Sequence, residues 1–103
     1  MRLTGKYANV DGRIRLVVQS ESGDRLTYDL GSASEFPNAI TDAIKQLVNL
    51  DQLSWIGCQQ SGSQTTCYGE GSQSIGLGRT QEFDIQLTIR ADGTIIIAVE
   101  EMI

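Results

Sequence analysis

"GSASEFPNAITDAIKQLVNLDQL", residues 31–53, is the segment in which the spacing of apolar residues changes to a helical period. Its apolar residues recur every three or four positions, as on one buried helix stripe: Phe36, Ile40, Ala43, Ile44, Leu47 and Val48. Ser34 is the expected N-cap, and Pro37 is tolerated in a first turn. The sequence predicts this one amphipathic helix and no other, covering one face of a sheet.

The segment before this helix alternates apolar and polar residues, which is typical of strands with one buried face. Asp11-Gly12 is a strong signal for a two-residue hairpin turn, and it pairs Tyr7 with Leu16. The connection at residues 20–24 then returns the chain as a third strand. The result is a three-stranded meander whose solvent face pairs Arg15 with Asp29.

The segment at 82–103, "EFDIQLTIRADGTIIIAVEEMI", predicts a C-terminal hairpin. A two-residue turn would separate its apolar residues, whereas a three-residue loop at 91–93 keeps them on one face. That loop pairs Ile89 with Ile95, Leu87 with Ile97 and Ile85 with Val99. The predicted fold class is therefore α+β, with an antiparallel sheet made of the meander and C-terminal hairpins, packed on one amphipathic helix.

Both cysteines lie in "GCQQSGSQTTCYGEGSQSIGLGRT", residues 57–80. A turn at 62–63 with glycine first pairs Cys58 with Cys67 across a short hairpin. Their backbone separation in such a pair is at the short edge of the range that a disulfide accepts, so a cross-link is allowed. Two reduced thiols, as in a reducing cytosol, are the alternative, and the sequence leaves both open.

Glycine and serine predominate in "GEGSQSIGLG", residues 69–78, which we interpret as a mobile loop. It either connects two strands or becomes ordered on a partner. It is no phosphate-binding loop, because Leu77 and Gly78 stand where Lys and Ser or Thr are needed. Upstream of the cysteine hairpin, Trp55 and Ile56 are expected to anchor their strand to the core.

Length and charge restrict the class of protein. The chain has 103 residues, enough for a single domain over 1–103, and thirteen acidic against eight basic residues give a net charge of −5. This sign argues against direct nucleic-acid binding and against anchoring to an anionic membrane. Neither a membrane span nor a signal peptide is evident, so we expect a cytoplasmic protein.

Several catalytic chemistries are excluded by composition. The chain contains no histidine, which removes Ser-His-Asp and Cys-His catalysis and the common imidazole zinc sites. Two cysteines cannot form a four-thiolate site, and no Asp-rich loop offers an oxygen-only metal site. We expect no cofactor and no metal, and we predict that the protein is not an enzyme. An enzyme using only Ser, Thr, Cys or carboxylates is the least favoured class.

Acidic residues are concentrated in the later part of the chain. Residues 1–28 hold five basic and three acidic side chains, whereas residues 29–103 hold three basic and ten acidic ones. The C-terminal register places Asp84 opposite Glu100, and like charges in such a pair repel. A plain solvated acidic face, a bound cation and a basic partner are the alternatives.

We therefore expect a small acidic inhibitor or antagonist that docks on a basic protein, such as a nucleic-acid-processing enzyme. Immunity proteins and phage anti-defence proteins are examples of this class, by analogy only. The predicted contact residues are Glu82, Asp84, Glu100 and Glu101, together with Glu70, Gly71 and Ser72 of the loop. The alternative is a structural subunit, for example a homodimer, that self-associates through exposed sheet edges such as the C-terminal one.

Overall fold

One antiparallel sheet and one α-helix make up the fold, and a computed structural model describes it over residues 1–102. The α+β class predicted from the sequence is confirmed. The elements in chain order are β1 (Arg2–Val10), β2 (Arg13–Ser20), β3 (Arg25–Leu30), a 3₁₀ helix (Ala33–Glu35), α1 (Phe36–Val48), β4 (Gln52–Ser61), β5 (Gln64–Gly76), β6 (Arg79–Ile89) and β7 (Thr94–Glu101).

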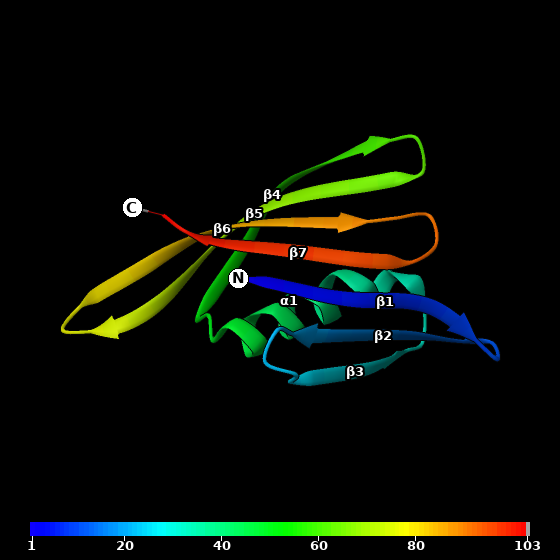
Figure 1. The fold of residues 1–103 in the computed structure, drawn as a ribbon, viewed down its shortest axis with the longest axis horizontal. Helices are drawn as coiled ribbons and strands as arrows, with labels where there is room; N and C mark the ends of the chain where they lie inside the picture. The colour runs from blue at the N-terminus through cyan, green and yellow to red at the C-terminus, as the bar shows by residue number, and fades with distance from the viewer. Residues whose placement is uncertain (103) are drawn as a thin grey trace.

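The seven strands lie in the order β3-β2-β1-β7-β6-β5-β4 (Figure 1). The pairing of β1 with β7, in which Leu3 lies opposite Ile97, joins the first three strands to the last four. The expectation that the C-terminal strand forms an exposed edge is therefore wrong. Both sides of β7 are paired, β1 and β7 contribute apolar residues to the same buried core as α1, and the two outer strands are β3 and β4.

The hairpins have the registers that the sequence patterns indicate. Asp11 and Gly12 both have positive φ, 52° and 81°, and Tyr7 lies opposite Leu16. In the second hairpin, Ile89 lies opposite Ile95 around the loop at 91–93. In this loop the backbone N–H of Thr94 donates to Asp92 Oδ1 over 2.9 Å, and that hydrogen bond holds the pKa of Asp92 below its usual range.

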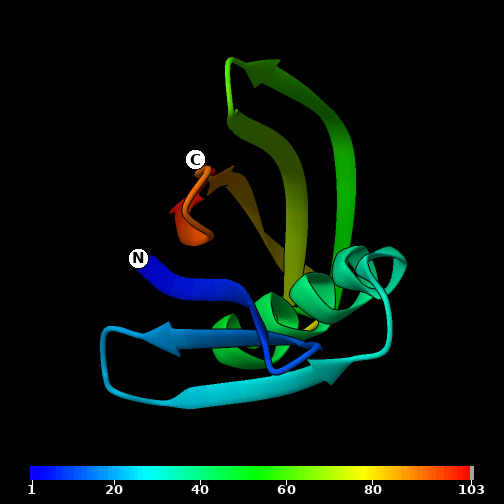
Figure 2. The ribbon, with the colours of Figure 1, turned by 90° about the vertical axis from the view of Figure 1, so that its right-hand side faces the viewer.

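Figure 2, turned by 90° from Figure 1, shows the sheet curving around α1, so the helix lies on the concave side. The buried residues of α1 are Ala39, Ile40, Ala43 and Ile44; the last three belong to the predicted stripe, whereas Ala39 does not. The helix contacts β2 and β3 on one side and β4 on the other. We call the opposite side of the sheet the open face.

The N-terminal cap lies two residues earlier than predicted. Ser32, rather than Ser34, caps the 3₁₀ helix that leads into α1. The carboxylate of Glu35, three positions further on, accepts hydrogen bonds from the backbone N–H groups of Gly31 and Ser32, which completes a capping box. The Ser34 hydroxyl instead lies 2.7 Å from that of Ser32.

Two polar contacts fix the helix to the outer strands. The hydroxyl of Tyr28 in β3 donates to Asp42 Oδ2 over 2.7 Å, and the indole N–H of Trp55 in β4 donates to Thr41 Oγ1 over 2.8 Å. Burial, followed by the hydrogen bond to Asp42 and its negative charge, raises the pKa of Tyr28 well above its ordinary value. The position of α1 is thus set by hydrogen bonds at both sides of the sheet.

The glycine-rich segment at 69–78 is no mobile loop, which corrects the prediction. Most of it belongs to β5, which pairs with β4 and β6. Gly69 lies opposite Trp55, and a Cβ on Gly69 would be 2.9 Å from Trp55 Cε3 and 3.0 Å from the carbonyl oxygen of Ser54. A Cβ on Gly71 would be 2.7 Å from Leu50 Cδ1. These glycines are therefore required by close packing against larger side chains.

We predict that Gly69→Ala lowers the free energy of unfolding by about 1–3 kcal/mol, because the added methyl group overpacks against an indole ring that Thr41 holds in place. Urea unfolding followed by circular dichroism measures this loss. Gly57→Ala is the matched control, since Gly57 lies in β4 and a Cβ there meets nothing within 4 Å. Its free energy of unfolding should stay the same or rise by up to about 1 kcal/mol. Equal effects of the two substitutions would contradict the packing role of Gly69.

Candidate protein-binding surface

Three carboxylates lie in a row across three neighbouring strands. Glu70 of β5 lies opposite Asp84 of β6, which lies opposite Glu100 of β7. All three are exposed, and we call them the acidic row. Directly opposite residues have Cβ atoms about 4.5–5.5 Å apart, so the row is a closely spaced set of negative charges. Ser72 and Glu82, also paired with each other, lie one step further along the strands on the same face.

Two of the predicted contact residues do not share this face. Gly71 lies opposite Phe83, and Phe83 lies opposite Glu101. Phe83 is buried in the core with α1, and directly opposite residues project to the same side of a sheet. Gly71 and Glu101 therefore belong to the helix side. This corrects the prediction that all seven residues form one surface: the open face unites Glu70, Asp84, Glu100, Ser72 and Glu82.

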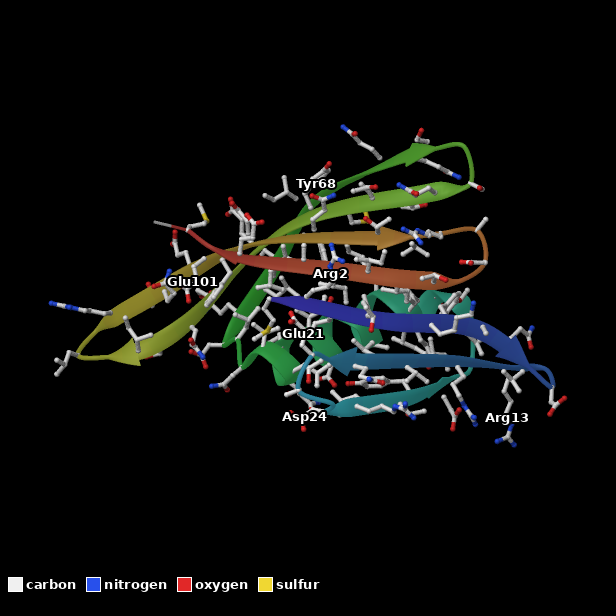
Figure 3. The ribbon with its side chains drawn as sticks, viewed as in Figure 1. Arg2, Arg13, Glu21, Asp24, Tyr68 and Glu101 are labelled. Carbon is white, nitrogen blue, oxygen red and sulfur yellow. A yellow bond between two sulfur atoms is a disulfide. The ribbon has the colours of Figure 1, made fainter. Side chains whose placement is uncertain are left out.

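No basic side chain neutralises the acidic row in the described part of the chain. The one ion pair within residues 1–102 joins Arg15 Nε to Asp29 Oδ1 over 3.2 Å, on β2 and β3. Arg2 lies opposite Ala98, at the β1 side of β7 (Figure 3). The acidic row thus presents uncompensated charge on a paired and ordered part of the sheet.

A hollow of about 370 Å³ opens beside the acidic row, and we call it the open-face hollow. Asp84 and Glu100 line it together with apolar and polar side chains from three strands and a bulge: Ile56, Tyr68, Gln86 and Ala98. Ile56 and Tyr68 are 68% and 44% exposed. The prediction that Ile56 anchors its strand to the core is wrong, because the register shifts between Trp55 and Gly57 and leaves Ile56 outside the ladder.

An apolar tip, absent from the predicted contact residues, extends from the end of the β5–β6 hairpin (Figure 1). Ile75 is 56% exposed and Leu77 is fully exposed. Leu77 also has a φ of 53°, in the left-handed region that side chains larger than Asn or Asp seldom adopt. The two apolar residues among the glycines of "SIGLG" are the signal in the sequence that identifies this tip.

A disulfide joins Cys58 and Cys67, the pair whose opposition the sequence predicts. It lines a second hollow, of about 310 Å³, between the N-terminal half of α1 and strands β4 to β6. The remaining lining residues of this hollow are Phe36, Pro37, Ile40, Trp55, Leu87 and Ile89. The disulfide therefore ties the outer strand β4 to β5 beside the core.

Within residues 1–102, no group of three or more Cys, Asp or Glu side chains is arranged to hold a metal ion. The same residues contain no helix that is long and apolar enough to cross a membrane. Comparison of the chain with known protein families, curated proteins and solved structures finds no match.

We predict that Asp84→Asn raises the free energy of unfolding by about 0.2–1 kcal/mol at low ionic strength, because it removes the central charge of the acidic row. The gain should shrink in ~1 M NaCl, where the screening length is about 3 Å. Urea unfolding at the two salt concentrations measures both effects. Asp29→Asn is the control with the opposite sign, since it breaks the ion pair with Arg15. A loss of stability in Asp84→Asn at low salt would show that the row is not repulsive.

Proposed function

We propose that the protein is a non-enzymatic binding protein that docks its acidic row on a basic surface of another protein. One observation supports this most strongly: Glu70, Asp84 and Glu100 lie side by side on three adjacent strands, with no basic partner among the described residues. Such a row costs stability in the free protein. A cationic partner surface would turn that repulsion into attraction.

The open face suits docking because its side chains stand on a rigid scaffold. Both β5 and β6 are paired on each side, so the carboxylates keep their spacing in the free protein. Preorganised charges lose little conformational entropy on binding, and complementary charge accelerates association and excludes wrong partners. The acidic row therefore contributes mainly to specificity and association rate.

An apolar anchor accompanies the charged surface in this proposal. Protein interfaces generally have a desolvated centre with a few anchoring side chains and a polar rim. The tip residues Ile75 and Leu77 extend from the same two strands that carry Glu70 and Asp84. We assign Leu77 to an apolar recess of the partner, beside the basic surface that meets the acidic row.

The class of partner follows from the charge pattern. Enzymes that process nucleic acids hold phosphates with Lys and Arg, so their substrate grooves are basic. A row of carboxylates on one face offers such a groove negative charges in place of phosphates. We therefore propose an inhibitor or antagonist of such an enzyme, comparable in principle to immunity proteins and phage anti-defence proteins.

Asp84→Lys should abolish capture of a basic partner from a host or target-cell lysate at ~50 mM salt, because it reverses the centre of the acidic row. Glu101→Lys makes the same change in net charge on the helix side and should leave capture intact. Wild-type capture should be lost at ~500 mM salt, since screening weakens contacts between exposed charges. Equal capture by wild type and Asp84→Lys would refute the docking surface.

Self-association through a sheet edge is a second candidate, favoured by the unpaired outer side of β4. The bulge at Trp55–Gly57 interrupts this edge, which hinders pairing with a second copy. We predict a monomer at tens of micromolar in multi-angle light scattering. A concentration-dependent dimer, disrupted by a proline in β4, would favour assembly over docking.

A further inference from the structure

The open-face hollow has two chemically different walls. One wall consists of the exposed side chains of Ile56 and Tyr68, and the other consists of the carboxylates of Asp84 and Glu100. Asp84 and Glu100 are directly opposite each other on β6 and β7, so both charges face the same small volume. The hollow is therefore amphipathic: apolar on the β4–β5 side and negative on the side of the acidic row.

Small residues and the bulge keep this space open. Tyr68 lies opposite Gly57, which has no side chain to cover the ring, and opposite Gln86 on its other side. Gln86 lies opposite Ala98, whose single methyl group leaves room beside Glu100. The bulge moves Ile56 out of the ladder to the rim. Tyr68 and Arg2, both labelled in Figure 3, belong to this row of paired residues.

The volume and the charge restrict the occupant. Pockets for small molecules usually measure about 300–1,000 Å³, and this one, at about 370 Å³, is at the lower end and is open to solvent. Its size suits one long side chain of a partner better than a larger ligand. The occupant must carry positive charge at one end, to complement the carboxylates, and apolar surface along its stem, to pack against the apolar wall.

We propose that the open-face hollow binds an arginine side chain of the basic partner, with the guanidinium between Asp84 and Glu100 and against the Tyr68 ring, and the stem against Ile56. This inference rests on the proposed function, which it makes more specific. A guanidinium is planar, donates hydrogen bonds in several directions within one plane and stacks on aromatic rings. It can therefore contact two neighbouring carboxylates and the Tyr68 ring together. The compact, strongly hydrated ammonium of lysine matches this arrangement less well.

The nearby charges favour the same assignment. Glu70 is next to Asp84 in the acidic row and adds negative potential, whereas Arg2 of β1, directly opposite the lining residue Ala98, adds positive charge on the same face. No ion pair with Arg2 occupies Asp84 or Glu100. An incoming guanidinium therefore has two carboxylates available without first displacing an internal cation.

An NMR titration of the ¹⁵N-labelled protein with N-acetyl-arginine methylamide tests this inference. We expect saturable shifts of the backbone amides of Gln86, Ala98 and Glu100. N-acetyl-lysine methylamide should bind more weakly, and the uncharged citrulline analogue should produce no saturable shift. Tyr68→Ala should weaken arginine binding about two- to fivefold without altering net charge, which corresponds to a cation–π contact at an exposed site. Asp84→Asn should weaken it further.

Glu82→Gln is the matched control, because it removes an exposed carboxylate of the open face that does not line the hollow. It should leave arginine binding unchanged. Equal binding of the arginine and lysine probes, unaffected by Tyr68→Ala, would overturn the arginine hollow. So would the absence of saturable shifts with all three probes. In both cases the proposed function is tested separately by comparing partner capture by the wild type and by Asp84→Lys. That comparison does not depend on Tyr68.

Discussion

The structure depends on one helix covering one face of a seven-stranded sheet. The apolar stripe of α1 is narrow, and the sheet brings enough strands to it only by curving around it. Contacts with β2 and β3 on one side and β4 on the other hold that curvature, and the hydrogen bonds of Tyr28 and Trp55 to the helix maintain it. The apolar residues of the concave side are consequently committed to packing. The side chains of the open face are not packed against the helix, so charged side chains can remain solvated there.

This division explains how the acidic row can persist despite its electrostatic cost. The close packing of Gly69 against Trp55 on the concave side keeps β5 in register, and this register aligns Glu70 with Asp84 on the other side. The burial of Phe83, Ile85 and Leu87 holds β6 in the same way. Apolar packing on one face thus outweighs like-charge repulsion on the other.

The sequence predicts those parts of the structure that short-range rules determine. The helix stripe, the Asp11-Gly12 turn and the opposition of Asp84 and Glu100 all follow from periodicity and turn chemistry within one element or hairpin. The pairing of β1 with β7 has no local signal. The glycines at 69 and 71 suggest a flexible segment when only local composition is considered. Their packing role is set by contacts with Trp55 and Leu50, which are distant in the sequence. Similarly, the bulge that exposes Ile56 creates the open-face hollow only when β4 meets β5.

The pairing of β1 with β7 also has a consequence for synthesis on the ribosome. Arg2 lies opposite Ala98, and these positions are 96 residues apart in the chain. At a translation rate of about 5–20 residues per second, β7 is synthesised roughly 5–20 s after β1. During this interval the meander has an open edge at β1, beside the apolar side chain of Leu3, which is fully buried in the finished fold. The nascent chain is thus most susceptible to mispairing at the edge of β1, which β7 covers in the completed sheet.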